Sequence, residues 1–224
     1  MRTISAFLIL SAASWPQGED RAPVTARIRA ASPGRAVLTV TNHGGFPLTA
    51  LAYGSGNAAD PFDPAWMFCD AAMGQFEPVP RGRSAVLSCL GPPTPDAGAT
   101  VAVAAGVFAG GSSFGDPALV SRIERRRQYM LSAMEEIVAL MKREMAEGKK
   151  KNEITAELRS TLSQKLQEAA GADQGECLRS VYEPSIRAVT ETLRDAPMPV
   201  LPYTAMRRQI ADFETRRAIL LTIK

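Results

Sequence analysis

Residues 107–123, VFAGGSSFGDPALVSRI, decide the fold because the sequence changes here from a strand pattern to a helix pattern. Before this stretch apolar and polar residues alternate, which places the apolar side chains on one face of a β-strand. After it apolar residues recur every three or four positions, as on one face of an α-helix. Asp116 and Pro117 favour a helix start, because aspartate caps the first free amides and proline fits the first helical position. We therefore expect a segregated α+β chain.

The half before this switch is predicted to consist of strands. Four segments alternate apolar and polar residues, and turn-forming residues separate them: 24–30, 36–40, 85–89 and 101–107. Short alternating strands with such turns are typical of antiparallel sandwiches, so we predict an N-terminal Ig-like β-sandwich over residues 22–110. Composition supports a boundary there, since residues 1–110 contain no Lys and 11 of the 16 Pro lie before residue 96.

The half after the switch is predicted to form a helical hairpin or bundle over residues 117–224, with one long helix. The first helix is expected to end near Gly148 and the second near Gly171, because glycine is common just after a helix. A third helix is expected to kink or restart at Pro184. A last helix is expected at about 204–222, after a linker formed by three prolines, Pro197, Pro199 and Pro202. We interpret residues 111–116 as a hinge.

The first 14 residues resemble a secretory signal peptide. A positive charge at Arg2 precedes the apolar segment 4–10, and small residues follow at 11–14. The alternative is a buried N-terminal strand or short helix. With a signal peptide, the protein would be exported to the periplasm or outside the cell. No apolar run reaches the roughly 18 residues of a spanning helix, so we expect no transmembrane segment after cleavage.

Composition excludes several classes of protein. The chain has 224 residues, 46% of them hydrophobic, a mean hydropathy of −0.07 and a net charge of +3. These values are typical of a soluble globular protein, and the charge is too small to indicate nucleic-acid binding. Residues 54–59 imitate a dinucleotide-binding loop, but prolines at 61 and 64 preclude the helix that such a site needs. We therefore expect no cofactor.

Ser113 lies in a G-x-S-x-G motif, between a predicted strand and a predicted helix, as in the nucleophile elbow of serine hydrolases. Such a serine needs a histidine base that follows it in the chain. His43 is the only histidine, it precedes Ser113, and its neighbours favour a surface turn. We expect no catalytic residues, with a serine hydrolase using Ser113 as an alternative.

Cysteines and acids in the first half suggest structural roles. In an oxidising compartment we expect a disulfide between Cys69 and Cys89, with three buried thiols as the alternative and Cys177 left unassigned. The spacing of the three acids Asp60, Asp63 and Asp70 does not match a calcium loop. We interpret them as solvated loop acids and expect no metal site.

The helical half carries a basic run, residues 122–127, and a series of methionines. We interpret the basic run mainly as a solvated face, although Arg127 falls on the apolar seam, where it is expected to pair with an acid or cross to the sandwich. We expect the methionines to belong to an adaptable core, and as an alternative four residues form a possible interaction surface: Arg127, Met130, Met134 and Met141. We expect an exported, non-enzymatic binding or scaffolding protein with a protein partner. A periplasmic chaperone or adaptor with Met-bearing helices is a further alternative.

Overall fold

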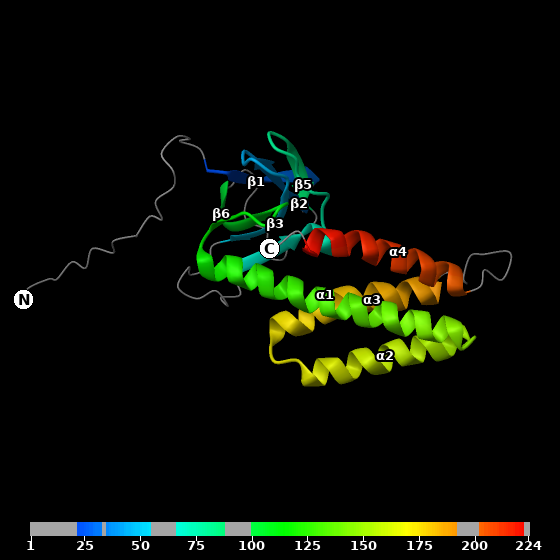
Figure 1. Cartoon of the computed structure of the whole chain (residues 1–224). Helices are drawn as coiled ribbons and strands as arrows, with labels where there is room; N and C mark the ends of the chain where they lie inside the picture. Colours follow the sequence, from blue (N-terminus) through cyan, green and yellow to red (C-terminus); the bar gives the residue numbers. More distant parts are fainter. Residues whose placement is uncertain (1–21, 33–34, 55–65, 88–99, 192–201, 222–224) are drawn as a thin grey trace, which may run out of the picture.

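The structure is a computed structural model that describes residues 22–32, 35–54, 66–87, 100–191 and 202–221. An antiparallel β region precedes a helical region, as Figure 1 shows, and this confirms the predicted segregated α+β class. The strands are β1 (Val24–Ser32), β2 (Arg35–Asn42), β3 (Leu48–Gly54), β4 (Trp66–Asp70), β5 (Ser84–Leu87), β6 (Thr100–Phe108) and β7 (Ser113–Gly115), with a 3-10 helix η1 (Ala71–Met73) after β4. The helices are α1 (Pro117–Ala146), α2 (Lys151–Glu168), α3 (Ala172–Glu191) and α4 (Pro202–Leu221).

The β region consists of two antiparallel sheets that share β6. The order of hydrogen-bonded neighbours is β4-β3-β6-β1-β2-β5, and β7 pairs with β6. The first residues of β6 pair with β1, where Val101 lies opposite Ala26. The rest of β6 pairs with β3, where Ala105 lies opposite Ala52. One long strand therefore joins both sheets around a common apolar interior.

The strands β1 and β2, which are identified by alternation, have one buried face, as predicted, whereas the last four residues of β6 are all buried. Leu38 and Val40 of β2 and Leu87 of β5 are fully buried in this interior. Each such side chain contributes about 1.5–3 kcal/mol through removal of its apolar surface from water.

The strand β3 does not alternate, because it is covered on both faces. Its first six residues are all buried. Ala50 and Ala52 pack against Leu119 of α1, while Leu51 faces the interior between the sheets. Two-sided burial explains why a period of two does not reveal this strand.

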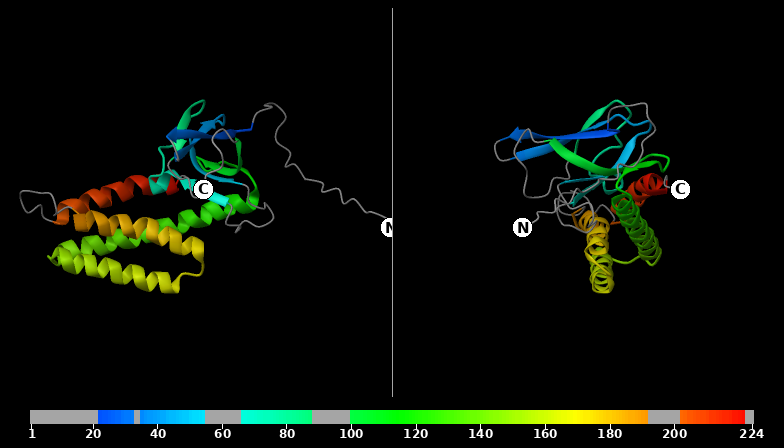
Figure 2. Two further views of the ribbon diagram at one scale, coloured as in Figure 1. Left: turned by 180° about the vertical axis from the view of Figure 1, so that it is seen from behind. Right: turned by 90° about the vertical axis from the view of Figure 1, so that its left-hand side faces the viewer.

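The long helix α1 begins where the sequence predicts. The Oδ1 atom of Asp116 accepts hydrogen bonds from the amides of Ala118 and Leu119, at 2.8 and 3.2 Å. The helix has 30 residues and is therefore about 45 Å long. It starts beneath the β region and extends to the far end of the helical region (Figures 1 and 2).

Three local predictions need correction. The expected hinge at 111–116 contains β7, which pairs with β6 because Phe114 is an apolar anchor. α3 continues through Pro184, so a restart there is wrong, while the alternative of a kink stays a prediction. Pro202 is the first residue of α4, a position at which proline is tolerated because the backbone N–H that it lacks would have no partner within the helix.

Some predictions fall on residues that the structure does not describe: the signal peptide, Pro197 and Pro199. No helix in the described part of the chain is long and apolar enough to cross a membrane.

Candidate functional site

The first half of α1 is fixed to the β region through Arg127, which is 1% exposed. Its Nε donates a hydrogen bond to Oδ2 of Asp70 at 2.6 Å. Its Nη2 donates to Oδ1 of Asp70 at 3.2 Å and to Oγ1 of Thr49 at 3.0 Å. The Thr49 hydroxyl in turn donates to the Val107 carbonyl at 3.0 Å. The prediction that Arg127 pairs with an acid or crosses to the β region is confirmed on both counts.

Asp70 is not a solvated loop acid, and that interpretation is wrong. Asp70 ends β4, and its side chain is 8% exposed. Its Oδ1 also accepts a hydrogen bond from the amide of Ala72 at 2.8 Å, which starts η1. The acid is buried because Arg127 and the η1 amide together replace its water ligands. Asp60 and Asp63 lie outside the described residues.

The rest of the basic run holds α3 against α1. Asp173 accepts hydrogen bonds from Nε of Arg122 at 2.6 Å and from Nη1 of Arg126 at 2.7 Å. Both guanidinium groups lie over the ring of Phe68 in β4, at 4.4 and 5.1 Å from its centre. Arg126 is 4% exposed, so the prediction of a solvated face is wrong for Arg126. The amphipathic pattern does not reveal these pairs because both partner acids lie in other elements.

These arginines also set the charge state of Asp173. Burial raises the pKa of this carboxyl, but the hydrogen bonds from Arg122 and the charge of Arg126 outweigh that effect. The pKa of Asp173 is therefore lower than its usual value of 3.8. The carboxylate stays ionised near neutral pH and binds both arginines, which keeps α1 and α3 together.

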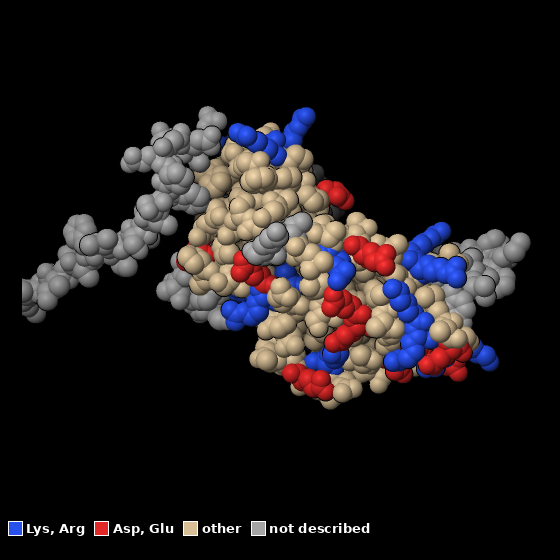
Figure 3. Space-filling view, in the orientation of Figure 1, with Lys and Arg blue, Asp and Glu red and all other residues tan. Residues whose placement is uncertain are grey.

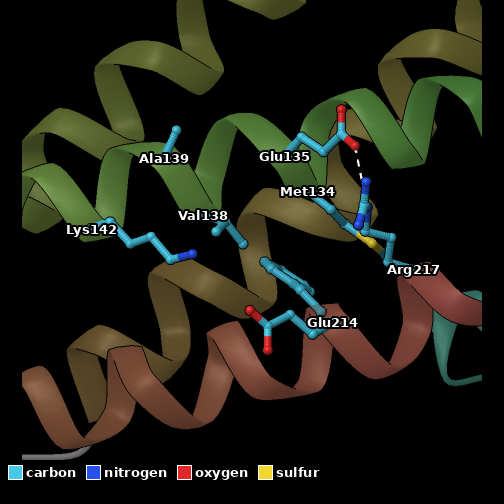
Figure 4. A pocket seen from close by; sticks show the side chains of 8 residues that line it. Met134, Glu135, Val138, Ala139, Lys142, Glu214 and Arg217 are labelled. Atoms are coloured by element: carbon cyan, nitrogen blue, oxygen red, sulfur yellow. Dashed lines mark hydrogen bonds and ion pairs between the residues drawn. The ribbon is translucent and has the colours of Figure 1, made fainter.

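A groove lies on the outer side of the antiparallel pair α1 and α4 (Figure 4). Its volume is about 320 Å³, and eight residues line it: Met134, Glu135, Val138, Ala139, Lys142, Phe213, Glu214 and Arg217. Met134 and Phe213 are buried beneath it, at 2% exposure each. Val138 is half-buried and Ala139 is exposed. We call this feature the α1–α4 groove; its floor is apolar and it is open to solvent.

Four charged side chains surround this floor. Arg217 donates a hydrogen bond from Nε to Oε1 of Glu135 at 3.3 Å across one end of the groove. Lys142 extends over the floor from α1, and Glu214 extends from α4 (Figure 4). Neither Lys142 nor Glu214 forms an ion pair with a residue in the described ranges. The groove thus presents apolar surface together with one unpaired charge of each sign.

The four residues named as a possible interaction surface are all buried, which agrees with the expectation that the methionines belong to the core. Arg127 and Met130 are 1% exposed, Met134 is 2% exposed, and Met141 is fully buried. The three methionines pack in the helical core, and only Met134 borders the α1–α4 groove. The stripe predicted from the sequence therefore faces inward, toward the other helices. Phe213 and Arg217 of α4 were not predicted from the sequence; they lie four residues apart and therefore on the same face of the helix.

Ser113 and His43 do not form a hydrogen bond with each other. Ser113 is exposed on β7 opposite Val107, and no residue other than glycine has a positive φ in the described ranges. A nucleophile elbow places its serine on a sharp, strained turn, so this backbone differs from it. His43 shares a hydrogen bond of 3.1 Å between its Nε2 and the Thr25 hydroxyl.

The cysteines divide between the two regions. Cys177 is a free thiol buried in the helical core, and burial raises its pKa to about 12. Cys69 lies on β4 and is 1% exposed. Cys89 lies outside the described residues, so the Cys69–Cys89 disulfide stays a prediction.

Within the described ranges, no group of three or more His, Cys, Asp or Glu side chains could hold a metal ion. No protein-family model, curated protein or solved structure matches this chain. A proposal of function therefore depends on the geometry of the chain itself.

Proposed function

We propose that this chain is an exported, non-enzymatic binding protein that holds a segment of a protein partner in the α1–α4 groove. The single observation that carries the proposal is the open apolar floor of the groove, with unpaired charges at Lys142 and Glu214. Apolar surface bordered by separate charges is typical of protein-binding sites, since the apolar part gives affinity and the charges give orientation.

The size and shape of the groove favour a protein segment over a small molecule. Small-molecule sites are commonly about 300–1,000 Å³ and bury most of the ligand. The groove, at about 320 Å³, is at the lower limit and is open along its length. A large apolar side chain that projects from a partner would fill it, while the rest of the partner stays outside.

The chemistry of the lining residues supports binding. None of the eight described residues that line the groove is Ser, Thr, Cys or His, so the lining holds no hydroxyl or thiol nucleophile with a histidine base. The buried Arg127–Asp70 pair holds α1 against the β region, so one wall of the groove is fixed before a partner arrives. A preformed site loses less conformational entropy on binding.

The surroundings of the site complete the proposal. We take the β region to be an Ig-like sandwich that serves as the platform for α1. In the view of Figure 3 charged side chains of both signs cover the helical region, whereas the β region shows few. Export depends on the signal-like residues 1–14 acting as a cleaved signal peptide. Mass spectrometry of the mature N-terminus tests this cleavage, since an intact Met1 on exported protein would contradict a cleaved signal peptide.

Site-specific photo-crosslinking in cells of the source organism tests the binding function. A benzoylphenylalanine at Ala139 would lie at the groove, and one at Ala118 would lie on the same helix outside it; both alanines are exposed. We expect a discrete crosslinked protein from position 139, absent from position 118 and absent when Val138→Glu is added. Identical products from both positions, or none from position 139, would contradict the proposal.

A further inference from the structure

The charge along the α1–α4 groove is unequal at its two ends. One end holds the Glu135–Arg217 ion pair, whose charges compensate each other. Toward the other end lies Lys142, seven residues further along α1 than Glu135. The two helices run antiparallel, so the beginning of α4 lies toward this second end (Figures 1 and 2).

Arg207 extends this basic end. It lies seven residues before Glu214 on α4, which is two helical turns and therefore the same face. Its side chain is exposed, and neither Arg207 nor Lys142 forms an ion pair with another residue of the described ranges. Among the described residues that line the groove, Glu214 is the one acid outside the Glu135–Arg217 pair. This end of the groove therefore attracts negative charge.

The backbone of the two walls determines the conformation of the bound segment. An extended peptide is recognised largely through hydrogen bonds to the free edge of a sheet. The walls of this groove are helices, whose amides and carbonyls already bind each other within each helix. A segment docked here must satisfy its own backbone, and an α-helix does so. The ridge of a third helix also fits the groove between two others.

We infer that the α1–α4 groove takes an amphipathic helix of a partner protein that carries acidic side chains. One large apolar residue of this helix would lie over Val138 and Phe213. Acidic residues one to two turns away would face Lys142 and Arg207. This inference rests on the proposed function and adds the chemistry of the partner to it.

Selection from a displayed library of helical peptides, randomised at all surface positions, tests the inference with the whole chain as bait. We expect selected peptides to combine a large apolar residue with Asp or Glu three to seven positions away. The double variant K142E/R207E should weaken their binding at least tenfold, measured by fluorescence anisotropy. Because both cations are exposed, added salt should weaken binding by the wild-type chain as well. Arg179→Glu, an exposed charge reversal on α3, should leave affinity unchanged.

Three outcomes would overturn the inference. They are a selection that yields no binders, selected peptides without acidic enrichment, and an affinity that K142E/R207E does not reduce. Circular dichroism of the double variant checks that its helices are intact. The proposed function has its own readout, the crosslink from position 139. A positive crosslink with no acidic preference would therefore remove this inference alone, whereas an absent crosslink would remove the binding function.

Discussion

Arg127 of α1 and Asp70 of β4 form a buried ion pair, with 2.6 Å between Nε and Oδ2 and side chains only 1% and 8% exposed. The pair joins residues 57 positions apart in the chain and connects the two regions of the fold. The Nη1 atom of Arg127 is buried and has no hydrogen-bond partner in the described part of the chain. The pair therefore fixes the position of α1 on the β region but does not add a large net stabilisation of the folded state.

Arg127→Met should lower the free energy of unfolding by about 3–5 kcal/mol, because it leaves the Asp70 carboxylate buried without its counterion. Urea unfolding followed by circular dichroism measures this change. Gln128→Met, on the exposed neighbouring position of the same helix, should change stability by less than about 0.5 kcal/mol.

The double variant R127M/D70N tests whether the two residues act as a pair. Asparagine keeps the oxygen that accepts from the Ala72 amide, so η1 should remain. We expect the double variant to be more stable than the sum of the two single losses by about 1–3 kcal/mol. Additive losses would show that the ion pair does not contribute as described.

Gly115→Ala should destabilise the β region by about 2 kcal/mol or more. Gly115 has a φ of +91°, and a Cβ there would overlap the backbone carbonyl of Ala104 in β6. Thermal unfolding monitors the effect. Gly45→Ala is the control, since a Cβ at Gly45 meets nothing within 4 Å and its φ is not positive. Equal melting temperatures for the two variants would contradict this role of Gly115.

The same glycine gives the G-x-S-x-G motif a structural role. The motif follows a strand and precedes a helix, as in a nucleophile elbow. In the structure its last glycine allows close approach of β7 to β6, and Phe114 packs 5.5 Å from Phe108, measured between ring centres. A short motif cannot distinguish these two needs for glycine, whereas the count of histidines argues for the structural one.

Local signals predict elements well, and contacts between distant elements poorly. The Asp116 cap and the alternation in β2 depend on neighbouring residues, so the sequence reveals them. Burial of Met130 follows from helical spacing, but spacing does not say whether the apolar stripe faces the core or a partner. The groove depends on how α4 packs on α1, and no pattern within α1 contains that information.

Thiol titration tests both the burial of Cys177 and the predicted Cys69–Cys89 disulfide. The folded chain should not react with Ellman's reagent at Cys177, because this thiol is fully buried and its pKa is raised to about 12.

Unfolding without a reductant should release one thiol per chain if the disulfide is present. Three thiols would mean that it is absent. Cys177→Ser should reduce the single thiol to none. The disulfide would close a loop of about 20 residues and contribute roughly 3 kcal/mol.

Asp173 should make the stability of the chain depend on pH in the acid range. Burial raises its pKa, but the hydrogen bonds from Arg122 and the charge of Arg126 lower the pKa by a larger amount, so its folded pKa is below 3.8. The unfolded state therefore binds this proton more readily, and the contribution of Asp173 is complete above the unfolded pKa and lost as the pH falls through the folded pKa. Urea unfolding at a series of pH values from about 6 to about 2.5 should show this loss.

Asp173→Asn should lower stability at neutral pH and flatten the acid decline. Glu183→Gln, which removes an exposed carboxylate from the same helix, should leave the decline in place. A wild-type and an Asp173→Asn chain with parallel pH profiles would show that the arginines do not hold Asp173 in its ionised form.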